Sequence, residues 1–160
     1  MDKNTVLLRD VIIKHHPEFI QQQELSNFCM KYSEMFNIEK LIEHTLSAVG
    51  GYEFVDAAGF DFDDFSDSKT VTINRKTLKG EIGSVENKIG ALRITAYNPV
   101  KDSVDYFFVP ANKLDEVRIP CYGKNKHKQR IVFQYNRIYD HYNQFEKYRV
   151  HSFTQLAKLT

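Results

Sequence analysis

The chain has 160 residues, of which 42% are hydrophobic and 27% are charged. This length and composition are typical of one globular domain, so we expect a single domain over residues 1–160 and exclude fibrous, disordered and membrane proteins. The net charge of +1 gives no electrostatic argument for a polyanionic partner from the chain as a whole, so the distribution of charge has to be considered instead.

The first predicted elements are two helices and a strand. Apolar residues recur at helical spacing in residues 18–34 and 38–49. The second helix has the clearer signals, because Asn37 is a good N-cap and Gly50 follows the apolar stripe as a stop. A short strand is expected next, at residues 52–55.

The middle of the chain is predicted to be rich in strands. Residues 56–67 are expected to form an acidic loop, and the β-branched residues that follow predict a strand at residues 69–74. Residues 92–97 and 104–109 flank a polar segment that opens with Asn98-Pro99. This pattern predicts an antiparallel hairpin.

The last predicted elements are a strand at residues 131–135 and helices at residues 137–148 and 153–159. No repeat or linker divides the chain, so we predict an α/β fold with a mixed, largely antiparallel central sheet flanked by helices. Cys29 and Cys121 form no CxxC pattern, and the N-terminus lacks the apolar run of a signal peptide. A cytoplasmic location and no membrane partner are therefore expected.

Charge is distributed unevenly along the chain. Residues 53–67 contain six acids and no lysine or arginine, namely Glu53, Asp56, Asp61, Asp63, Asp64 and Asp67. Residues 118–130 contain five bases and no acid, namely Arg118, Lys124, Lys126, Lys128 and Arg130. A protein that holds a divalent cation against a polyanion needs both a negatively charged and a positively charged region. Two solvated loops would give the same pattern.

Asp67 and Lys69 stand two residues apart at the start of the strand predicted for residues 69–74. Because side chains alternate along a strand, both should lie on one face. The carboxylate of Asp67 can bind a hard cation such as Mg²⁺, and the ammonium of Lys69 can orient or deprotonate a water. Asp61 can bring a second carboxylate to the same ion, and crowded carboxylates raise each other's pKa when no cation neutralises them.

Asp61 followed by Asp67-Ser68-Lys69-Thr70 resembles the bipartite motif of the PD-(D/E)XK nucleases, a superfamily that includes many type II restriction endonucleases. The short spacing is similar to that of the mismatch-repair nicking endonucleases, in which a helical glutamate precedes the motif. Glu43, on the helix predicted at residues 38–49, takes that place here. No proline precedes Asp61, so Asp56 remains a second candidate for the upstream acid.

The resemblance implies a restriction-endonuclease-like fold and a Mg²⁺-dependent endonuclease, for which Mn²⁺ can substitute, that cuts double-stranded DNA as a homodimer. It implies catalytic roles for Glu43, Asp61, Asp67 and Lys69, and metal binding by Asp61, Asp67 and Asp56. Two alternatives stay open: a monomeric nicking or repair nuclease, and a DNA-binding or phage accessory protein that has this fold without cleavage.

The sequence offers two other placements of the site. Glu86-Asn87-Lys88 also contains an acid-x-Lys pattern, with Asp67 as its upstream acid, but its weak strand character favours a solvated turn. A calcium-binding EF-hand loop beginning at Asp61 is excluded, because Phe65 occupies a ligand position, Ser66 replaces the required glycine and Thr72 replaces the bidentate glutamate.

The basic segment is the candidate DNA-binding element. Its lysines can contact phosphates, and its amide side chains suit the edge of adenine. The residues concerned are Lys124, Asn125, Lys126, Lys128, Gln129 and Arg130. A solvated loop is the alternative interpretation of the same residues.

Overall fold

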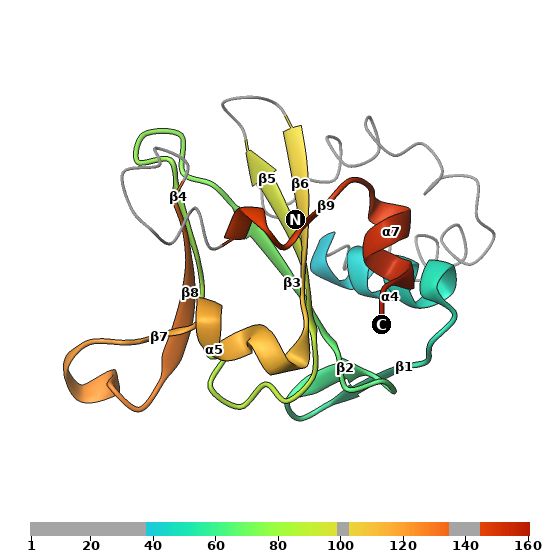
Figure 1. Cartoon of the computed structure of the whole chain (residues 1–160), viewed down its shortest axis with the longest axis horizontal. Helices are drawn as coiled ribbons and strands as arrows, with labels where there is room; N and C mark the ends of the chain where they lie inside the picture. The colour runs from blue at the N-terminus through green and yellow to red at the C-terminus, as the bar shows by residue number, and fades with distance from the viewer. Residues whose placement is uncertain (1–37, 99–102, 135–144) are drawn as a thin grey trace.

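The computed structural model of the protein describes residues 38–98, 103–134 and 145–160 (Figure 1). The helix predicted at residues 18–34 lies outside these ranges, as does most of the helix predicted at residues 137–148. Within the described ranges no helix has the length and apolar character needed to span a membrane.

The described chain opens with helix α4 (Ile38–Gly50), in close agreement with the helix predicted at residues 38–49. Ile42 and Leu46, four residues apart and therefore on one side of the helix, are both fully buried. Glu39 lies in the first turn, where a negative charge stabilises the helix dipole. Gly51 follows with a φ of 79°, the left-handed conformation that commonly ends a helix.

The acidic segment does not form the loop that was predicted for residues 56–67. It contains the end of β1 (Phe54–Ala57) and all of β2 (Phe60–Phe62), which pair in an antiparallel hairpin. Gly59 takes a φ of 91° in the turn between them. The prediction was wrong because the segment pairs with itself: Phe54 stands opposite Phe62, and Phe62 is fully buried in one core with Ile42 and Leu46.

The largest sheet has the strand order β3-β5-β6-β9. Its strands are β3 (Asp67–Thr72), β5 (Leu92–Asn98), β6 (Ser103–Val109) and β9 (Arg149–Val150). β5 and β6 form the predicted antiparallel hairpin, whereas β3 runs parallel to β5. β3 begins at Asp67, two residues before the start that was predicted.

A second sheet has the order β4-β8-β7 and is antiparallel throughout. It consists of β4 (Lys79–Ile82), β7 (Ile119–Pro120) and β8 (Gln129–Gln134), the last of which corresponds to the strand predicted at residues 131–135. Short helices complete the described chain: η1 (Ala111–Lys113), α5 (Leu114–Val117), η2 (Gly123–Asn125) and α7 (Phe153–Lys158). The helix predicted at residues 153–159 is α7.

The two faces of the β3-β5-β6 sheet are covered differently. α4 and α7 lie on one side, and β4 and β8 lie on the other (Figure 1). Alternation along β5 sends Tyr97 into the core shared with the helices, here the helix-side core, and sends Leu92 and Ile94 into the core shared with β4 and β8, the sheet-side core.

The fold is therefore mixed α/β, with mostly antiparallel sheets, one parallel strand pair and few helices among the described residues. The predicted single central sheet flanked by helices is corrected, because the described strands form three sheets and the second one covers a face where helices were expected. β4 and β8 bury Ile82, Ile131 and Phe133 on one face, so they pack onto the first sheet and do not extend its edge.

Candidate active site

Asp67 and Lys69 lie on one face of β3, as the sequence predicted. In the parallel register they stand beside Leu92 and Ile94 of β5, whose side chains belong to the sheet-side core. The Nζ atom of Lys69 lies 3.5 Å from Oδ2 of Asp67. The Asp67 residue is 3% exposed, so this carboxylate is buried at the start of the strand.

Asp61 approaches Asp67 from the neighbouring hairpin. It lies in the centre of β2, and its Oδ2 accepts a hydrogen bond of 2.9 Å from the backbone amide of Ser68. This bond fixes the orientation of the carboxyl group beside β3. The carboxyl group of Asp67 lies close enough to raise the pKa of Asp61, so the structure brings the two acids together.

The electrostatics of this acid pair follow from its burial. Burial raises the pKa of Asp61, and the hydrogen bond and negative charge of Asp67 raise it further. The Ser68 amide and the ammonium of Lys88 lower it in part, and the net result is a pKa of about 6. The predicted rise in pKa is found at Asp61, and burial is its largest cause.

Lys88 is the member of the site that the sequence placed wrongly. The solvated turn predicted for residues 86–88 does not describe it, because its side chain is only 12% exposed and its Nζ lies 3.0 Å from Oδ2 of Asp67. Arg118 folds the turn inward by donating from Nη1 to the carbonyls of Val85 and Lys88, at 3.1 and 3.4 Å. Asp67 therefore contacts two ammonium groups, one from its own strand and one from this turn.

The two other acids predicted for the site lie on α4 and β1. Glu43 is buried on α4, 3.0 Å from Nζ of Lys40. α4 covers the helix-side face of the sheet, opposite to Asp67 and Lys69. Asp56 lies on β1, and its side chain is outside the described set. Across residues 38–98, 103–134 and 145–160, no three or more His, Cys, Asp or Glu side chains gather in a way that could hold a metal ion.

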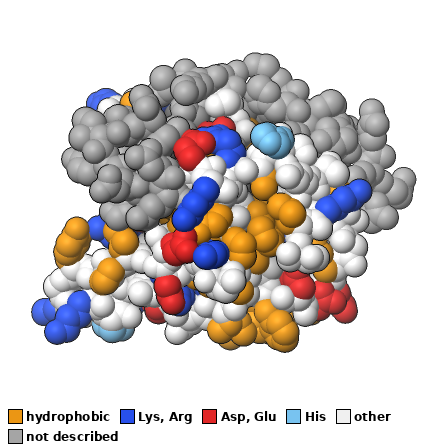
Figure 2. All heavy atoms as spheres, viewed as in Figure 1, with side chains coloured by type: hydrophobic (Ala, Val, Ile, Leu, Met, Phe, Trp, Pro, Cys, Tyr) orange, Lys and Arg blue, Asp and Glu red, His pale blue; other side chains and the backbone are white. Residues whose placement is uncertain are grey.

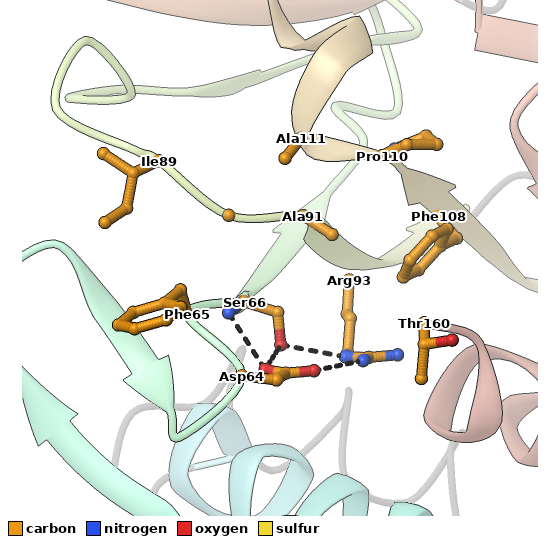
Figure 3. Close-up of a pocket in the computed structure, with 11 residues that line it drawn as sticks. Asp64, Phe65, Ser66, Ile89, Ala91, Arg93, Phe108, Pro110, Ala111 and Thr160 are labelled. Atoms are coloured by element: carbon orange, nitrogen blue, oxygen red, sulfur yellow. Dashed lines mark hydrogen bonds and ion pairs between the residues drawn. The ribbon is translucent and has the colours of Figure 1, made fainter.

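A buried arginine holds the acidic turn that precedes Asp67 (Figure 3). Arg93 is fully buried, and its Nη2 lies 2.9 Å from Oδ2 of Asp64. Its Nε donates to Oγ of Ser66 at 3.1 Å, and its Nη1 donates to the carbonyl of Leu156 at 2.6 Å. Arg93 thus ties the turn to α7 and fixes the point at which β3 begins.

These contacts stabilise the ionised form of Asp64. Burial raises the pKa of Asp64, but the hydrogen bonds from the hydroxyl and amide of Ser66 and from Arg93 outweigh it, so the net shift is downward. Asp64 and Arg93 form an ion pair with each other, and this pair stabilises the turn.

A cavity of about 340 Å³ lies beside this network, with apolar walls that include Phe65, Ile89, Phe108 and Pro110 (Figure 3). Its two sides belong to the turn before β3 and the turn that carries Lys88. The two turns pack directly at Gly90, where an added Cβ would lie 1.9 Å from the carbonyl oxygen of Phe65. A glycine is required there, and this close packing helps to set the position of Lys88.

The basic segment forms the tip of the projection between β7 and β8, where Lys and Arg side chains gather near a histidine (Figure 2). The exposed residues of the predicted DNA-binding set are Lys124, Asn125, Lys126 and Lys128. Gln129 and Arg130 are half-buried at the base of the tip. Nη1 of Arg130 lies 3.0 Å from Oε2 of Glu81, so this arginine is already paired within the protein.

The base of the projection is joined to the turn that carries Lys88. The amide of Gln129 donates to Oε2 of Glu86 at 3.2 Å, and the amide of Val85 donates to the carbonyl of Gln129 at 3.1 Å. Residues 85–88 therefore connect the basic projection with Asp67. The positive field and the acid pair belong to one continuous part of the molecule.

No protein-family model, curated protein or solved structure matches this chain.

Proposed function

We propose that the chain is a Mg²⁺-dependent endonuclease that hydrolyses phosphodiester bonds of double-stranded DNA, with a restriction-endonuclease-like active site of the PD-(D/E)XK type. The observation that carries the proposal is the buried acid pair Asp61–Asp67 with Lys69 beside it at the start of β3. This is the arrangement that the motif requires, and it is formed by residues from two separate strands.

The acid pair fits a magnesium ion by the chemistry of its donors. Both side chains offer hard oxygen atoms, and one or two protein carboxylates are the usual protein contribution to a Mg²⁺ site. Burial and the neighbouring Asp67 raise the pKa of Asp61, so a bound cation would relieve the cost of ionising this carboxyl group. When bound by Asp61 and Asp67, Mg²⁺ or Mn²⁺ would stabilise negative charge on the phosphate and lower the pKa of an attacking water.

The protein's own residues have separate tasks in this proposal. The amide of Ser68 holds the carboxylate of Asp61 in one orientation, and the ammonium of Lys69 holds that of Asp67. Lys69 is 27% exposed at its side chain, so it can also contact a water that arrives with the substrate and orient it for attack.

The basic projection supplies the contacts to DNA. Lys124, Lys126 and Lys128 are exposed at its tip and would bind phosphates, and Asn125 and Gln129 would read base edges. Two copies of the chain in a homodimer would place one acid pair on each strand of the duplex, which is the arrangement needed for a double-strand cut.

One observation favours a second candidate, a DNA-binding or phage accessory protein without cleavage. Oδ2 of Asp67 lies 3.0 Å from Lys88 and 3.5 Å from Lys69, so the carboxylate has positive partners within the protein. In a binding protein this cluster would be a permanent structural ion pair. The acid-x-Lys geometry would then remain without any reaction.

Incubation of supercoiled plasmid with the full chain and Mg²⁺ separates the candidates. The proposal predicts linear DNA, and a monomeric nicking enzyme would yield open circles only. A binding protein would shift the mobility of the plasmid and leave it supercoiled after the protein is removed. Plasmid that stays intact at every Mg²⁺ and Mn²⁺ concentration would refute the nuclease proposal.

A further inference from the structure

We propose that Lys88 is the resident counter-ion of Asp67 in the cation-free protein, and that it becomes a contact to a DNA phosphate when a divalent cation takes its place. The inference rests on the proposed function and adds to it a second lysine with a role distinct from that of Lys69.

The first argument is geometric. Lys88 and Lys69 contact the same oxygen of Asp67, but the Nζ of Lys88 is closer, at 3.0 Å against 3.5 Å. The side chain of Lys88 is 12% exposed and that of Lys69 is 27% exposed. A charge pair that is less exposed to water interacts more strongly, so Lys88 is the main partner of Asp67 in this state.

The second argument concerns what a divalent cation would meet at this oxygen. A cation and an ammonium repel each other at contact distance, so both cannot share Oδ2 of Asp67 without a large electrostatic cost. The turn backbone at Lys88 is fixed, because its carbonyl accepts from Arg118 and its amide donates to the carbonyl of Val85 at 3.3 Å. Displacement is therefore a rotation of the flexible lysine side chain, which is readily made.

The third argument is that a displaced Lys88 side chain would lie close to phosphates of bound DNA. The turn that carries Lys88 is bonded to the base of the basic projection through Glu86 and Gln129. DNA held by the exposed lysines of that projection would bring phosphates towards the same turn. A lysine ammonium is a compact charge with three donors and is a common phosphate ligand.

The experiment begins with calorimetric titration of Mg²⁺ into the full chain and its Lys88→Gln variant, without DNA. Removal of the competing charge should tighten Mg²⁺ binding by on the order of tenfold. Lys69→Gln is the matched control, and its gain should be smaller because Lys69 is farther from Asp67 and more exposed. Lys88→Arg keeps the charge and should retain the wild-type affinity for Mg²⁺.

The second measurement is the salt dependence of DNA binding, in EDTA and in Ca²⁺. In EDTA, wild type and Lys88→Gln should have the same salt slope, since Lys88 is occupied by Asp67. In Ca²⁺ the slope of wild type should exceed that of Lys88→Gln by roughly 0.9, the value for one phosphate contact.

The outcomes separate this inference from the proposed function. If wild type cuts DNA but Lys88→Gln binds Mg²⁺ no more tightly than Lys69→Gln does, or if the two slopes in Ca²⁺ are equal, the role of Lys88 is wrong and the nuclease proposal stands. If wild type binds no divalent cation and cuts nothing, both are wrong. Thermal unfolding of each variant shows whether a change in affinity reflects loss of the fold.

Discussion

Replacement of Asp61 by asparagine should make the protein more stable at neutral pH, and the gain should grow as the pH rises. Asparagine has the same shape, and it keeps an oxygen that can accept from the amide of Ser68, 2.9 Å from Oδ2 in the wild type. Its amide group can still donate to Asp67. The variant therefore keeps the hydrogen bonds and removes one of two adjacent negative charges.

The magnitude follows from the pKa of Asp61, which burial and the adjacent Asp67 raise from 3.8 to about 6. One pKa unit corresponds to about 1.4 kcal/mol, so ionisation of Asp61 in the folded protein costs roughly 3 kcal/mol. Because the folded state holds the proton more tightly than the unfolded state, the wild type loses this stability as the pH rises from about 4 through about 6. The variant has no such loss.

Urea unfolding of both proteins in EDTA, from about pH 4 to about pH 8, gives the difference in unfolding free energy at each pH. That difference should increase by roughly 3 kcal/mol over the range. The control is Asp63→Asn, which removes one negative charge from an exposed acid of the same hairpin. A difference for Asp61→Asn that is constant with pH, or that falls, would refute the proposed electrostatics of the acid pair.

Three further predictions concern the metal, the DNA and the fold. Cleavage should require Mg²⁺ or Mn²⁺, and Ca²⁺ should permit DNA binding without efficient cutting, because the site offers only hard oxygen donors; full activity in EDTA would exclude a metal mechanism. Alanine at Lys124, Lys126 and Lys128 together should weaken DNA binding and reduce its salt slope by roughly 0.9 per lost phosphate contact, as measured by titration at several salt concentrations; an unchanged slope would show that the tip does not contact DNA. Arg93→Met should lower the unfolding free energy by roughly 3 kcal/mol in urea, because Asp64 and the carbonyls that Arg93 bonds would lose a buried partner; a loss well under 1 kcal/mol would contradict its anchoring role.

The elements that the sequence predicted well are those whose signals are local. The β5–β6 hairpin follows from two apolar segments on either side of a polar segment that opens with Asn98-Pro99 in the sequence, and α4 follows from an amphipathic stretch that ends at Gly50-Gly51. The meeting of Asp67 and Lys69 follows from the alternation of side chains along one strand. In each case the decisive residues are close together in the sequence.

The elements that could not be predicted from the sequence depend on contacts with residues far away in the chain. β4 has weak strand character in isolation, and its pairing with β8 decides its conformation. The acid-x-Lys pattern at Lys88 was visible in the sequence, but its contact with Asp67 depends on Arg118, which folds the turn inward. Arg93 did carry a signal, because a lone charged residue in an apolar strand must be paired when it is buried.

Cleavage of DNA by an Asp67→Asn variant, measured beside DNA binding in the same preparation, tests the central claim most directly. Asparagine preserves the shape of the side chain and removes the charge that both the cation and Lys69 require. We expect cleavage to be abolished while DNA binding in EDTA is retained, and Asp63→Asn to cut at the wild-type rate. Cleavage by Asp67→Asn at the wild-type rate would contradict the claim that the acid pair at the start of β3 is the active site.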